Sequence, residues 1–580
     1  MRGCPDSQLH FGCATDGGQY IFTTVSRTLI PRLKRRFWAS FDVPSHPLSP
    51  RRFSITMRRH AFVICRTSVF FLLLSPPVPC ADWPTFGHDP QRSGWAVEEV
   101  TLKPENVAEL ELKWRVQMTN EPRSLTALTA PVVASEVTTP QGVKTVVYVA
   151  GSADNFSALD AQNGAVIWNH TFESNVLPKK EGMWLCPNGI NATPTIDRRR
   201  GVIYAIAVDG SLYGLDLGTG KTKLGPVQFV PPFSKNWSLN LVDGVVYTSI
   251  SQGCGGARSG IYSMDLRDST RPVIRELLTS PRGGAGIWGR GGPVAGATDR
   301  VYASTGDGEF DPPQGWFGST FIAASPRSLD LVDYFAPANY RHVTQYDLDM
   351  ASASPVWFAY RNFSLLAGGG KEGVLYLLDA DALGDKDHQT PLFTTKLAND
   401  DGEFEGKGIW GAVSQSRDEK GQAWIFVPIY GPVSKEAPRF PQSNGGNPHG
   451  SIMAFKVAVD GPLRKAALEP AWISGDFDLP DPVVIANGLV FALSTGENPQ
   501  QTQGPTVVYA GQKTLTDAER AQNTKHAVLC ALDAKTGKML YKSGDAIPNW
   551  VHFGGLAVAD GRVYAVDHES WVYCFGLKGK

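Results

Sequence analysis

The sequence lacks several features that would mark common classes of protein. Its 55 Lys and Arg residues are balanced by 56 Asp and Glu residues, which leaves a formal net charge of −1 at pH 7. Because the two signs are interspersed, the composition argues against a nucleic-acid-binding surface. No CxxCH motif occurs, so no covalently attached haem c is expected, and the absence of any CxxC pair excludes a zinc site of that kind.

Long hydrophobic runs are also missing. Residues 1–56 are basic and follow no period, so we expect either an upstream extension assigned to the chain in error or a poorly ordered tail. Residues 57–81 begin with Met-Arg-Arg, continue into a short apolar run at 67–75 and end in small residues. This pattern is typical of a secretory signal peptide and is too short for a membrane span. We therefore expect the true start at Met57 and a mature chain of residues 82–580, periplasmic or secreted, with no membrane span.

Cysteines are few in the expected mature chain. They are Cys186, Cys254, Cys530 and Cys574, with Cys80 added only if the signal is cut before it. In an exported protein, four cysteines could form two disulfides, and three pairings are possible.

Glycine, proline and tryptophan are abundant instead, with 60, 41 and 15 residues. One phrase recurs: an apolar stretch with an aromatic residue, a short turn, a second apolar stretch that ends in Asp, and a turn with Gly. Clear copies are VVYVAGSADNFSALDAQNGAVIW at 146–168 and VIYAIAVDGSLYGLDLGTGKTK at 202–223. Eight copies align on the third residue of each opening, at positions 148, 204, 247, 302, 366, 426, 491 and 564. This spacing indicates one repeat array rather than several domains.

Within each copy the side chains alternate with a period of two and are β-branched or aromatic, which predicts short strands. The turns DAQNG, LGTG and AKTG are tight turns that use glycine. Each copy supplies about four antiparallel strands, so the predicted fold is all-β, an eight-bladed β-propeller of four-stranded blades. A β-helix is the alternative, but its rungs are shorter. The segment ELKWRV at 111–116 precedes the first full copy, and we expect it to supply the outer strand of the last blade.

The stretch DWPTFGHDPQRSGWA at 82–96, the LKWRV segment and the repeated Asp-to-Gly turns together resemble the eight-bladed quinoprotein, or PQQ-dependent, alcohol dehydrogenases. Within that family the chain looks closest to the polyvinyl-alcohol-dehydrogenase-like branch, and the likeness covers residues 82–580. It implies an oxidoreductase in which pyrroloquinoline quinone lies flat on a tryptophan near the axis. A Ca²⁺ ion beside the quinone, a cationic side chain on its oxygens and an aspartate that takes the alcohol proton are implied as well.

Several tryptophans precede a repeat marker by 10 to 20 residues, which predicts positions near the channel at the start of an inner strand. They are Trp184, Trp237, Trp288, Trp410 and Trp550. An indole face suits stacking on a planar quinone. The resemblance favours Trp410, in GKGIWGA, as the floor, and the GIWG phrase recurs around Trp288. The alternative is that these indoles pack between blades.

Two further residues match the family's motifs. Lys371, in GGGKEGVLYLLDAD, matches the cation on the quinone, where an ammonium would stabilise charge on a reduced oxygen. Asp347, in VTQYDLDMASASPVW, matches the catalytic aspartate, with Tyr346 in place of a Trp and Asp349 as a second candidate. The alternatives are a surface lysine and turn-capping aspartates. Since catalytic groups must reach one substrate, Lys371, Asp347 and Trp410 should lie within about 15 Å of one another.

The implied metal site departs from the family. Asp307, in STGDGEFDP, stands where the family has an Asn ligand for Ca²⁺, and a carboxylate is a suitable ligand. The third blade, SQGCGGARSG, has no acid where the dehydrogenases carry a Glu ligand. The adjacent-cysteine ring of many relatives is missing too, and Cys254 is expected to pair with Cys186 because both lie in loops of neighbouring blades. An acidic cluster at 400–403 is a weaker candidate for Ca²⁺.

Three functions fit this pattern. The first is a quinoprotein oxidoreductase for a small alcohol or sugar, with electrons passing to a separate carrier such as a cytochrome. Long inserts at 307–345, 430–450 and 496–525 favour it, because enzymes build active-site walls from loops. The second is a cofactor-free propeller for binding or envelope assembly, which the missing Glu favours. The third is a polysaccharide-binding or lyase-like propeller that uses axial tryptophans on sugars.

Overall fold

The computed structural model describes residues 81–123, 126–174, 186, 189–296, 300–399, 407–461, 465–498, 500, 515–552 and 554–579. The chain divides into two compact units, Met1–Leu74 and Ser75–Lys580, and all described residues belong to the second. The predicted extension, the signal peptide up to Cys80, Trp184 and the acidic cluster at 400–403 lie outside the described residues. None of the described helices is long and apolar enough to cross a membrane.

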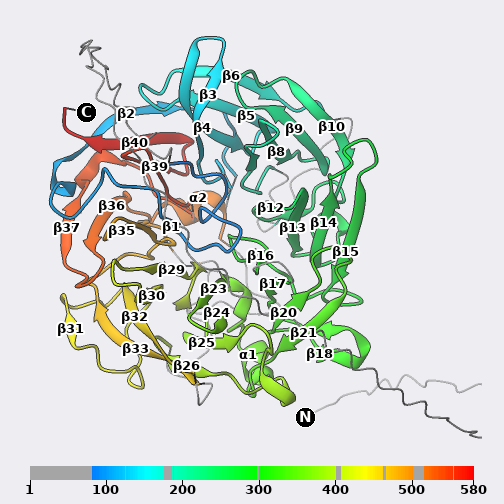
Figure 1. The fold of residues 1–580 in the computed structure, drawn as a ribbon, viewed down its shortest axis with the longest axis vertical. Helices are drawn as coiled ribbons and strands as arrows, with labels where there is room; N and C mark the ends of the chain where they lie inside the picture. Colours follow the sequence, from blue (N-terminus) through cyan, green and yellow to red (C-terminus); the bar gives the residue numbers. More distant parts are fainter. Residues whose placement is uncertain are drawn as a thin grey trace, which may run out of the picture. The chain divides into compact units, whose positions relative to one another are not determined.

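The described strands form eight radial sheets of at least four strands each around a central axis (Figure 1). Blade 1 contains β3 (Val132–Thr139), β4 (Gly142–Gly151), β5 (Asn155–Asp160) and β6 (Val166–Thr171). Blade 2 contains β7 (Thr195–Asp197), β8 (Val202–Ile206), β9 (Ser211–Asp216) and β10 (Thr222–Gln228). Blade 3 contains β11 (Lys235–Asn236), β12 (Asn240–Val242), β13 (Val245–Ser251), β14 (Gly260–Asp265) and β15 (Val273–Leu278). Blade 4 contains β16 (Val294–Ala295), β17 (Val301–Ser304), β20 (Phe321–Ala324) and β21 (Leu331–Phe335).

The second half of the ring repeats this plan. Blade 5 contains β23 (Val356–Tyr360), β24 (Phe363–Gly369), β25 (Val374–Asp379) and β26 (Phe393–Lys396). Blade 6 contains β27 (Gly408–Ile409), β29 (Ser414–Arg417), β30 (Ala423–Tyr430), β31 (Gln442–Ser443), β32 (Gly450–Asp460) and β33 (Lys465–Ile473). Blade 7 contains β1 (Trp95–Ala96), β34 (Val484–Ala486), β35 (Leu489–Ser494), β36 (Val528–Asp533) and β37 (Met539–Lys542). Blade 8 contains β2 (Leu110–Gln117), β38 (Ala557–Ala559), β39 (Arg562–Val566) and β40 (Trp571–Leu577).

Short elements fill the loops between these strands. Two small sheets pair β18 (Phe310–Asp311) with β19 (Trp316–Phe317) and β22 (Ala353–Ser354) with β28 (Gly411–Ala412). The α-helices in the described residues are α1 (Tyr340–Gln345) and α2 (Asp517–Ala521). The described 3-10 helices are η1 (Val107–Glu109), η2 (Cys254–Gly256), η3 (Pro312–Gln314), η4 (Met350–Ser352), η5 (Asp385–Asp387) and η6 (Gly544–Ala546). The eight-bladed propeller predicted from the repeat is therefore confirmed.

Each of the eight repeat markers lies in the second main strand of its blade, and each is buried. Strands β4, β8, β13, β17, β24, β30, β35 and β39 carry them. Because side chains on a strand alternate between its two faces, each of these strands packs against both neighbouring blades. The hydrophobic core accordingly forms clusters between adjacent blades, such as those joining blades 1 and 2, 3 and 4, and 4 and 5.

The N-terminal strand β2 closes the ring, as its sequence predicts. It pairs antiparallel with β40 from Leu110 opposite Leu577 to Gln117 opposite Trp571. Strand β1 pairs in parallel with β34 of blade 7, Trp95 opposite Ile485. The two ends of the propeller are thus joined by backbone hydrogen bonds.

Three tryptophans each join one blade to the next through the same type of contact. Each indole N–H donates a 2.9 Å hydrogen bond to a carbonyl in the Asp-to-Gly turn of the following blade: Trp114 to Ala161, Trp168 to Leu217 and Trp472 to Ala534. The glycine of each turn has a positive φ and lies against the ring, so that a Cβ would stand 2.3 to 2.7 Å from indole atoms: Gly164, Gly220 and Gly537. The repeated turn therefore also serves as the docking site for the neighbouring blade.

The cysteines follow only part of the expected pattern. Cys186 and Cys254 form a disulfide with their Cα atoms 5.4 Å apart, which confirms the expected pairing. Cys530 in β36 and Cys574 in β40 are free and buried, so a second disulfide is absent from the described residues. They belong to different blades, and each packs as a small apolar side chain within a hydrophobic cluster.

Replacing Gly220 with Ala tests the docking contact. The substitution strains a residue at φ +67° and pushes Cβ to 2.6 Å from the Trp168 ring. We expect it to lower the free energy of unfolding by about 2 to 4 kcal/mol, because overpacking adds to the cost of the backbone. Urea unfolding measures this. The matched control is Gly421→Ala, at φ +77° with open space around its Cβ, and equal losses in the two variants would contradict the docking role.

Candidate functional site

A buried lysine holds two aspartates together. Lys371 lies in the turn between β24 and β25, and its Nζ is 2.8 Å from both Asp347 Oδ1 and Asp349 Oδ2. The side chains of Lys371 and Asp349 are 6% and 3% exposed, and that of Asp347 is 18% exposed. The backbone N–H of Lys371 also donates to the carbonyl of Asp349, at 3.2 Å. The two groups predicted to act together, Lys371 and Asp347, are therefore in direct contact.

The local chain path explains why both aspartates face the lysine. Helix α1 ends at Gln345, and Asp347 follows with a φ of +54°, a left-handed conformation that Asp tolerates better than most residues. Asp349 is the N-cap of η4, and its Oδ1 accepts a 3.2 Å hydrogen bond from the N–H of Ala351. A carboxylate just beyond a helix C-terminus is disfavoured by the helix dipole. The positive charge of the Lys371 ammonium offsets this unfavourable interaction of Asp347 with the helix dipole.

Asp307 completes a group of three carboxylates. It follows β17 of blade 4, and oxygens of Asp307, Asp347 and Asp349 lie within 4.8 Å of one another. Oδ1 of Asp307 is buried and has no hydrogen-bond partner. A buried oxygen without a donor is costly, and a hard cation would satisfy it. The three carboxylates are thus chemically suited to bind a cation such as Ca²⁺. Asp349 supplies one acidic side chain here, whereas the third blade lacks the acid that the family carries there.

Burial and mutual repulsion govern the charges in this group. Burial, with the charges of Asp349 and Asp347, raises the pKa of Asp307 to about 10. Burial also raises the pKa of Asp349 to about 6, against the opposing effect of Lys371. Burial opposes ionisation of Asp347 as well, but Lys371 and the hydrogen bonds outweigh it and hold its pKa below the ordinary value. Although burial lowers the pKa of Lys371, the surrounding carboxylates raise it well above its usual range.

Two indoles lie beside this charged group. The rings of Trp288 and Trp410 are 5.8 Å apart at an interplanar angle of 61°. Nζ of Lys371 is 5.2 Å from the centroid of Trp288 and 5.8 Å from that of Trp410, so both are cation–π partners. A Cβ on Gly306 would lie 3.0 Å from Nε1 of Trp288, so a larger residue at this position would crowd the indole. The two GIWG phrases of the sequence therefore meet at one place.

The other candidate tryptophans lie in different surroundings. Trp237 donates from Nε1 to Oγ of Ser251 at 2.8 Å, and its ring faces Lys235 and Arg290. Trp550 stacks on His568, with centroids 4.1 Å apart at an interplanar angle of 17°.

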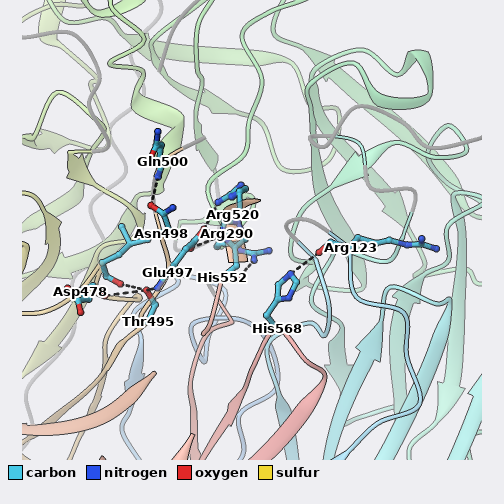
Figure 2. A network of polar contacts seen from close by, with 11 residues as sticks. Arg123, Arg290, Asp478, Thr495, Glu497, Asn498, Gln500, Arg520, His552 and His568 are labelled. Atoms are coloured by element: carbon cyan, nitrogen blue, oxygen red, sulfur yellow. Dashed lines mark hydrogen bonds and ion pairs between the residues drawn. The ribbon is translucent and has the colours of Figure 1, made fainter. Parts of the chain in front are cut away.

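A second polar network, absent from the sequence prediction, lies near Trp237 and Trp550 (Figure 2). Glu497 accepts hydrogen bonds from Nη2 of Arg520 at 2.7 Å and from Nδ1 of His552 at 2.7 Å. Nη2 of Arg290 donates to the carbonyl oxygen of His552, also at 2.7 Å. Burial lowers the pKa of His552 to about 4, so its imidazole is neutral and carries its proton on Nδ1.

One signal in the sequence could have located this network. Ser494-Thr495-Gly496-Glu497 repeats the Ser304-Thr305-Gly306-Asp307 phrase, each directly after the second main strand of its blade. Glu497 is thus the positional equivalent of Asp307 in blade 7. Its partners Arg520 and His552 follow no such repeat.

Comparisons with known proteins agree with this fold. Residues 83–245 match the profile of the PQQ family, described as the glucose/ethanol/alcohol dehydrogenase beta-propeller domain. A comparison with curated protein sequences gives no match.

Solved structures of quinoprotein dehydrogenases have the same architecture. A europium-containing methanol dehydrogenase matches with a TM-score of 0.55 at 14% identity, over 86% of this chain and 98% of its own. The quinohemoprotein alcohol dehydrogenase of Comamonas testosteroni matches with a TM-score of 0.52 at 14% identity, over 86% and 81%. Quinohemoprotein alcohol dehydrogenase ADHIIG of Pseudomonas putida HK5 matches with a TM-score of 0.51 at 16% identity, over 86% and 81%.

Replacing Lys371 with Met tests the charge arrangement. The variant leaves two buried carboxylates without their counter-charge, so we expect the free energy of unfolding to fall by about 3 to 5 kcal/mol. Urea unfolding in the presence of a chelator measures the loss, and added Ca²⁺ should recover part of it. The control is Lys525→Met, which breaks an exposed pair with Asp478 and should cost at most about 1 kcal/mol. A Lys371 variant as stable as the parent would contradict the arrangement.

Proposed function

We propose that this propeller, which has the fold of the PQQ-dependent alcohol dehydrogenases, is an exported oxidoreductase that oxidises an alcohol or sugar with pyrroloquinoline quinone. One observation carries the proposal: Lys371, Asp347 and Trp410, which three separate motifs suggested, lie together, with Nζ of Lys371 2.8 Å from Asp347 and 5.8 Å from the ring centroid of Trp410. The distances are far shorter than the roughly 15 Å that would remove the basis for joint action. Residues with no common role rarely bring a buried acid, a buried cation and an indole together.

The side chains at the site fit a flat quinone. Trp288 and Trp410 offer aromatic surface beside Lys371, whose ammonium would contact a quinone oxygen and stabilise negative charge there. When bound, the quinone supplies the acceptor for the two electrons and the hydrogen that leave the alcohol carbon as hydride. Trp237 and Trp550 are proposed to border the ligand rather than to form its floor, because they lie with the second network.

Asp347 is the proposed base. The substrate loses a hydride from carbon and a proton from its hydroxyl, and a carboxylate oxygen of Asp347 takes that proton as the carbonyl forms. Lys371 keeps the pKa of Asp347 low, so that the carboxylate is ionised and ready to accept. The 18% exposure of Asp347 leaves a path for the proton to reach solvent afterwards.

Asp307 and Asp349 are the proposed ligands of a hard cation, Ca²⁺ or a lanthanide, with Asp347 as a third ligand. The cation would bind the orphaned Oδ1 of Asp307 and displace its proton, since metal ligands must be deprotonated. In doing so it would also offset the repulsion that three adjacent carboxylates create.

The remaining features of the proposal concern location and electron transfer. The predicted signal peptide favours a periplasmic or secreted protein, and the lack of a CxxCH motif favours a separate electron carrier such as a cytochrome. A cofactor-free scaffold is the second candidate. It is favoured by the absence of any acid between Ser249 and Arg258.

Reconstitution tests the function. The purified protein is titrated with pyrroloquinoline quinone, with and without Ca²⁺, while tryptophan fluorescence is followed, and dye reduction is then measured with a panel of alcohols and sugars. Stoichiometric quenching with substrate-dependent dye reduction is expected. Absence of quenching under both conditions would favour the scaffold.

Replacing Asp347 with Asn tests the base. Asn also tolerates a positive φ, so the fold is expected to persist while kcat falls by about 10²- to 10⁴-fold. Quinone quenching should survive in the variant. The control is Asp243→Asn, an exposed turn residue with a similar φ of +49°, which should keep full activity. Turnover by the Asp347 variant at the parental rate would eliminate Asp347 as the base.

A further inference from the structure

Glu372, the residue that follows Lys371, is bonded to the helix that leads to Asp347. Its Oε1 accepts a 2.6 Å hydrogen bond from Nδ2 of Asn339, the N-cap residue of α1. Its Oε2 accepts a 3.3 Å hydrogen bond from the hydroxyl of Tyr376 in β25, a side chain that is buried between blades. Glu372 therefore ties a strand of blade 5 to the start of α1.

The side chain of Asn339 makes this contact instead of capping its own helix. Asparagine is a favoured N-cap residue because its side-chain oxygen can accept a hydrogen bond from a backbone N–H of the first helical turn. No such bond forms in α1. The hydrogen bond to Glu372 is thus what holds the side chain of Asn339, and it fixes the first turn of α1 to blade 5.

Helix α1 needs external contacts because it has only six residues, and isolated helices of this length are unstable in water. The ring of Tyr340 lies 4.7 Å from that of Phe310, and the hydroxyl oxygen of Thr344 lies 3.1 Å from that of Ser319. Both of these contacts lead to the loop between β17 and β20 of blade 4. Glu372 instead links α1 to the blade that carries Lys371.

Two consecutive residues therefore hold the segment 339–349 at both of its ends. The side chain of Glu372 holds the first residue, and its backbone N–H donates a 3.3 Å hydrogen bond to the carbonyl oxygen of Leu348. At the far end, Nζ of Lys371 lies 2.8 Å from an oxygen of each aspartate. A shift of α1 against this turn would change the distance between Asp347 and Lys371.

Hydrogen bonds matter more to the Glu372 carboxyl than its charge does. Burial raises the pKa of Glu372, and the hydrogen bonds from Asn339 and Tyr376 oppose this rise more strongly than the charges of Lys396 and His342. A neutral amide could keep both contacts, since its oxygen accepts from Asn339 and its NH₂ group donates to the hydroxyl of Tyr376. Glutamine should therefore replace Glu372 where alanine does not.

We propose that Glu372 is a positioning residue for Asp347, because it fixes the first turn of α1 through Asn339 and so sets the carboxylate of Asp347 against Lys371. The assignment rests on the proposed function, since it concerns the base of that reaction. Misplacement of a reacting group by about 1 Å can lower a rate about a hundredfold, so an anchor at the far end of a short helix can control kcat.

Amide hydrogen exchange of the full, quinone-free protein tests the anchor without any activity. Glu372→Ala and Asn339→Ala should each speed the exchange of residues 340–348 by about tenfold or more, because α1 loses its link to blade 5. Asn339 is exposed and its side chain caps nothing, so the Asn339 variant is expected to fold even if the Glu372 variant does not. Unchanged exchange in both variants would overturn the anchor.

Kinetics of the reconstituted enzyme test the positioning. In both alanine variants kcat should fall by about ten- to a hundredfold, while KM and the quenching of tryptophan fluorescence by the quinone change little. The acid limb of the kcat profile should move to higher pH, because an Asp347 carboxylate that loosens from Lys371 stays buried but loses the charge that holds its pKa low. A kcat within about twofold of the parent in both variants would contradict the role of Glu372.

Two further variants separate positioning from charge. Glu372→Gln should return exchange, kcat and the acid limb to near the parental values, whereas a loss as large as that of Glu372→Ala would assign the effect to charge and overturn positioning. Glu276→Ala removes an exposed glutamate that pairs with Arg258 on the outer strand β15, and it should change none of these measurements.

Failure of the proposed function gives a different result. A parent protein without quinone-dependent turnover would remove Asp347 as the base and with it the positioning role. Faster exchange in the two alanine variants would in that case still establish the link between Glu372 and α1.

Discussion

Pairing of β2 with β40 is the constraint on which the rest of this propeller depends. It turns eight radial sheets into a closed ring, so each blade is packed on both sides and the loops at the axis have fixed neighbours. Asp307 leaves blade 4, Lys371 belongs to blade 5, and Trp410 stands at the start of blade 6. Their mutual distances are therefore set by packing between blades rather than by any one loop.

Charge is arranged around the axis in two groups of opposite sign. Three carboxylates surround Lys371, and the cations Arg290 and Lys235 both lie over the indole ring of Trp237. Each group holds buried polar atoms that the chain itself does not satisfy, such as Oδ1 of Asp307 and Nδ2 of Asn191. Unsatisfied buried groups are costly, so a protein retains them where a ligand completes them.

Much of this could be predicted because the repeat is explicit. A period of two, a turn glycine and a buried marker residue recur in each blade, and they specify how far a residue lies from the axis. They do not specify which residues face one another across it. Trp237 and Trp550 share the spacing of Trp288 and Trp410, yet they lie with different partners.

The residues that the sequence did not reveal are those whose role depends on contacts across the ring. Arg290 directly follows the GIWG phrase around Trp288, but its partner is the carbonyl of His552, far away in the chain. Lys235 stood in no motif, because what distinguishes it is the sign of its neighbours. The pairing of Cys186 with Cys254, by contrast, followed from the adjacency of their blades and is confirmed, whereas Cys530 and Cys574 are free.

Closure by the first long strand also bears on how the protein is made. Strand β2 leaves the ribosome long before its partner β40, because the strands of blades 1 to 6 lie between the two in the chain. Until then β2 has an unpaired edge that could join another chain and aggregate. Glu111, Lys113 and Arg115 occupy alternate positions along it, and charged side chains of this kind discourage such pairing. The charged side chains of β2 thus disfavour aggregation through its unpaired edge until β40 has been synthesised.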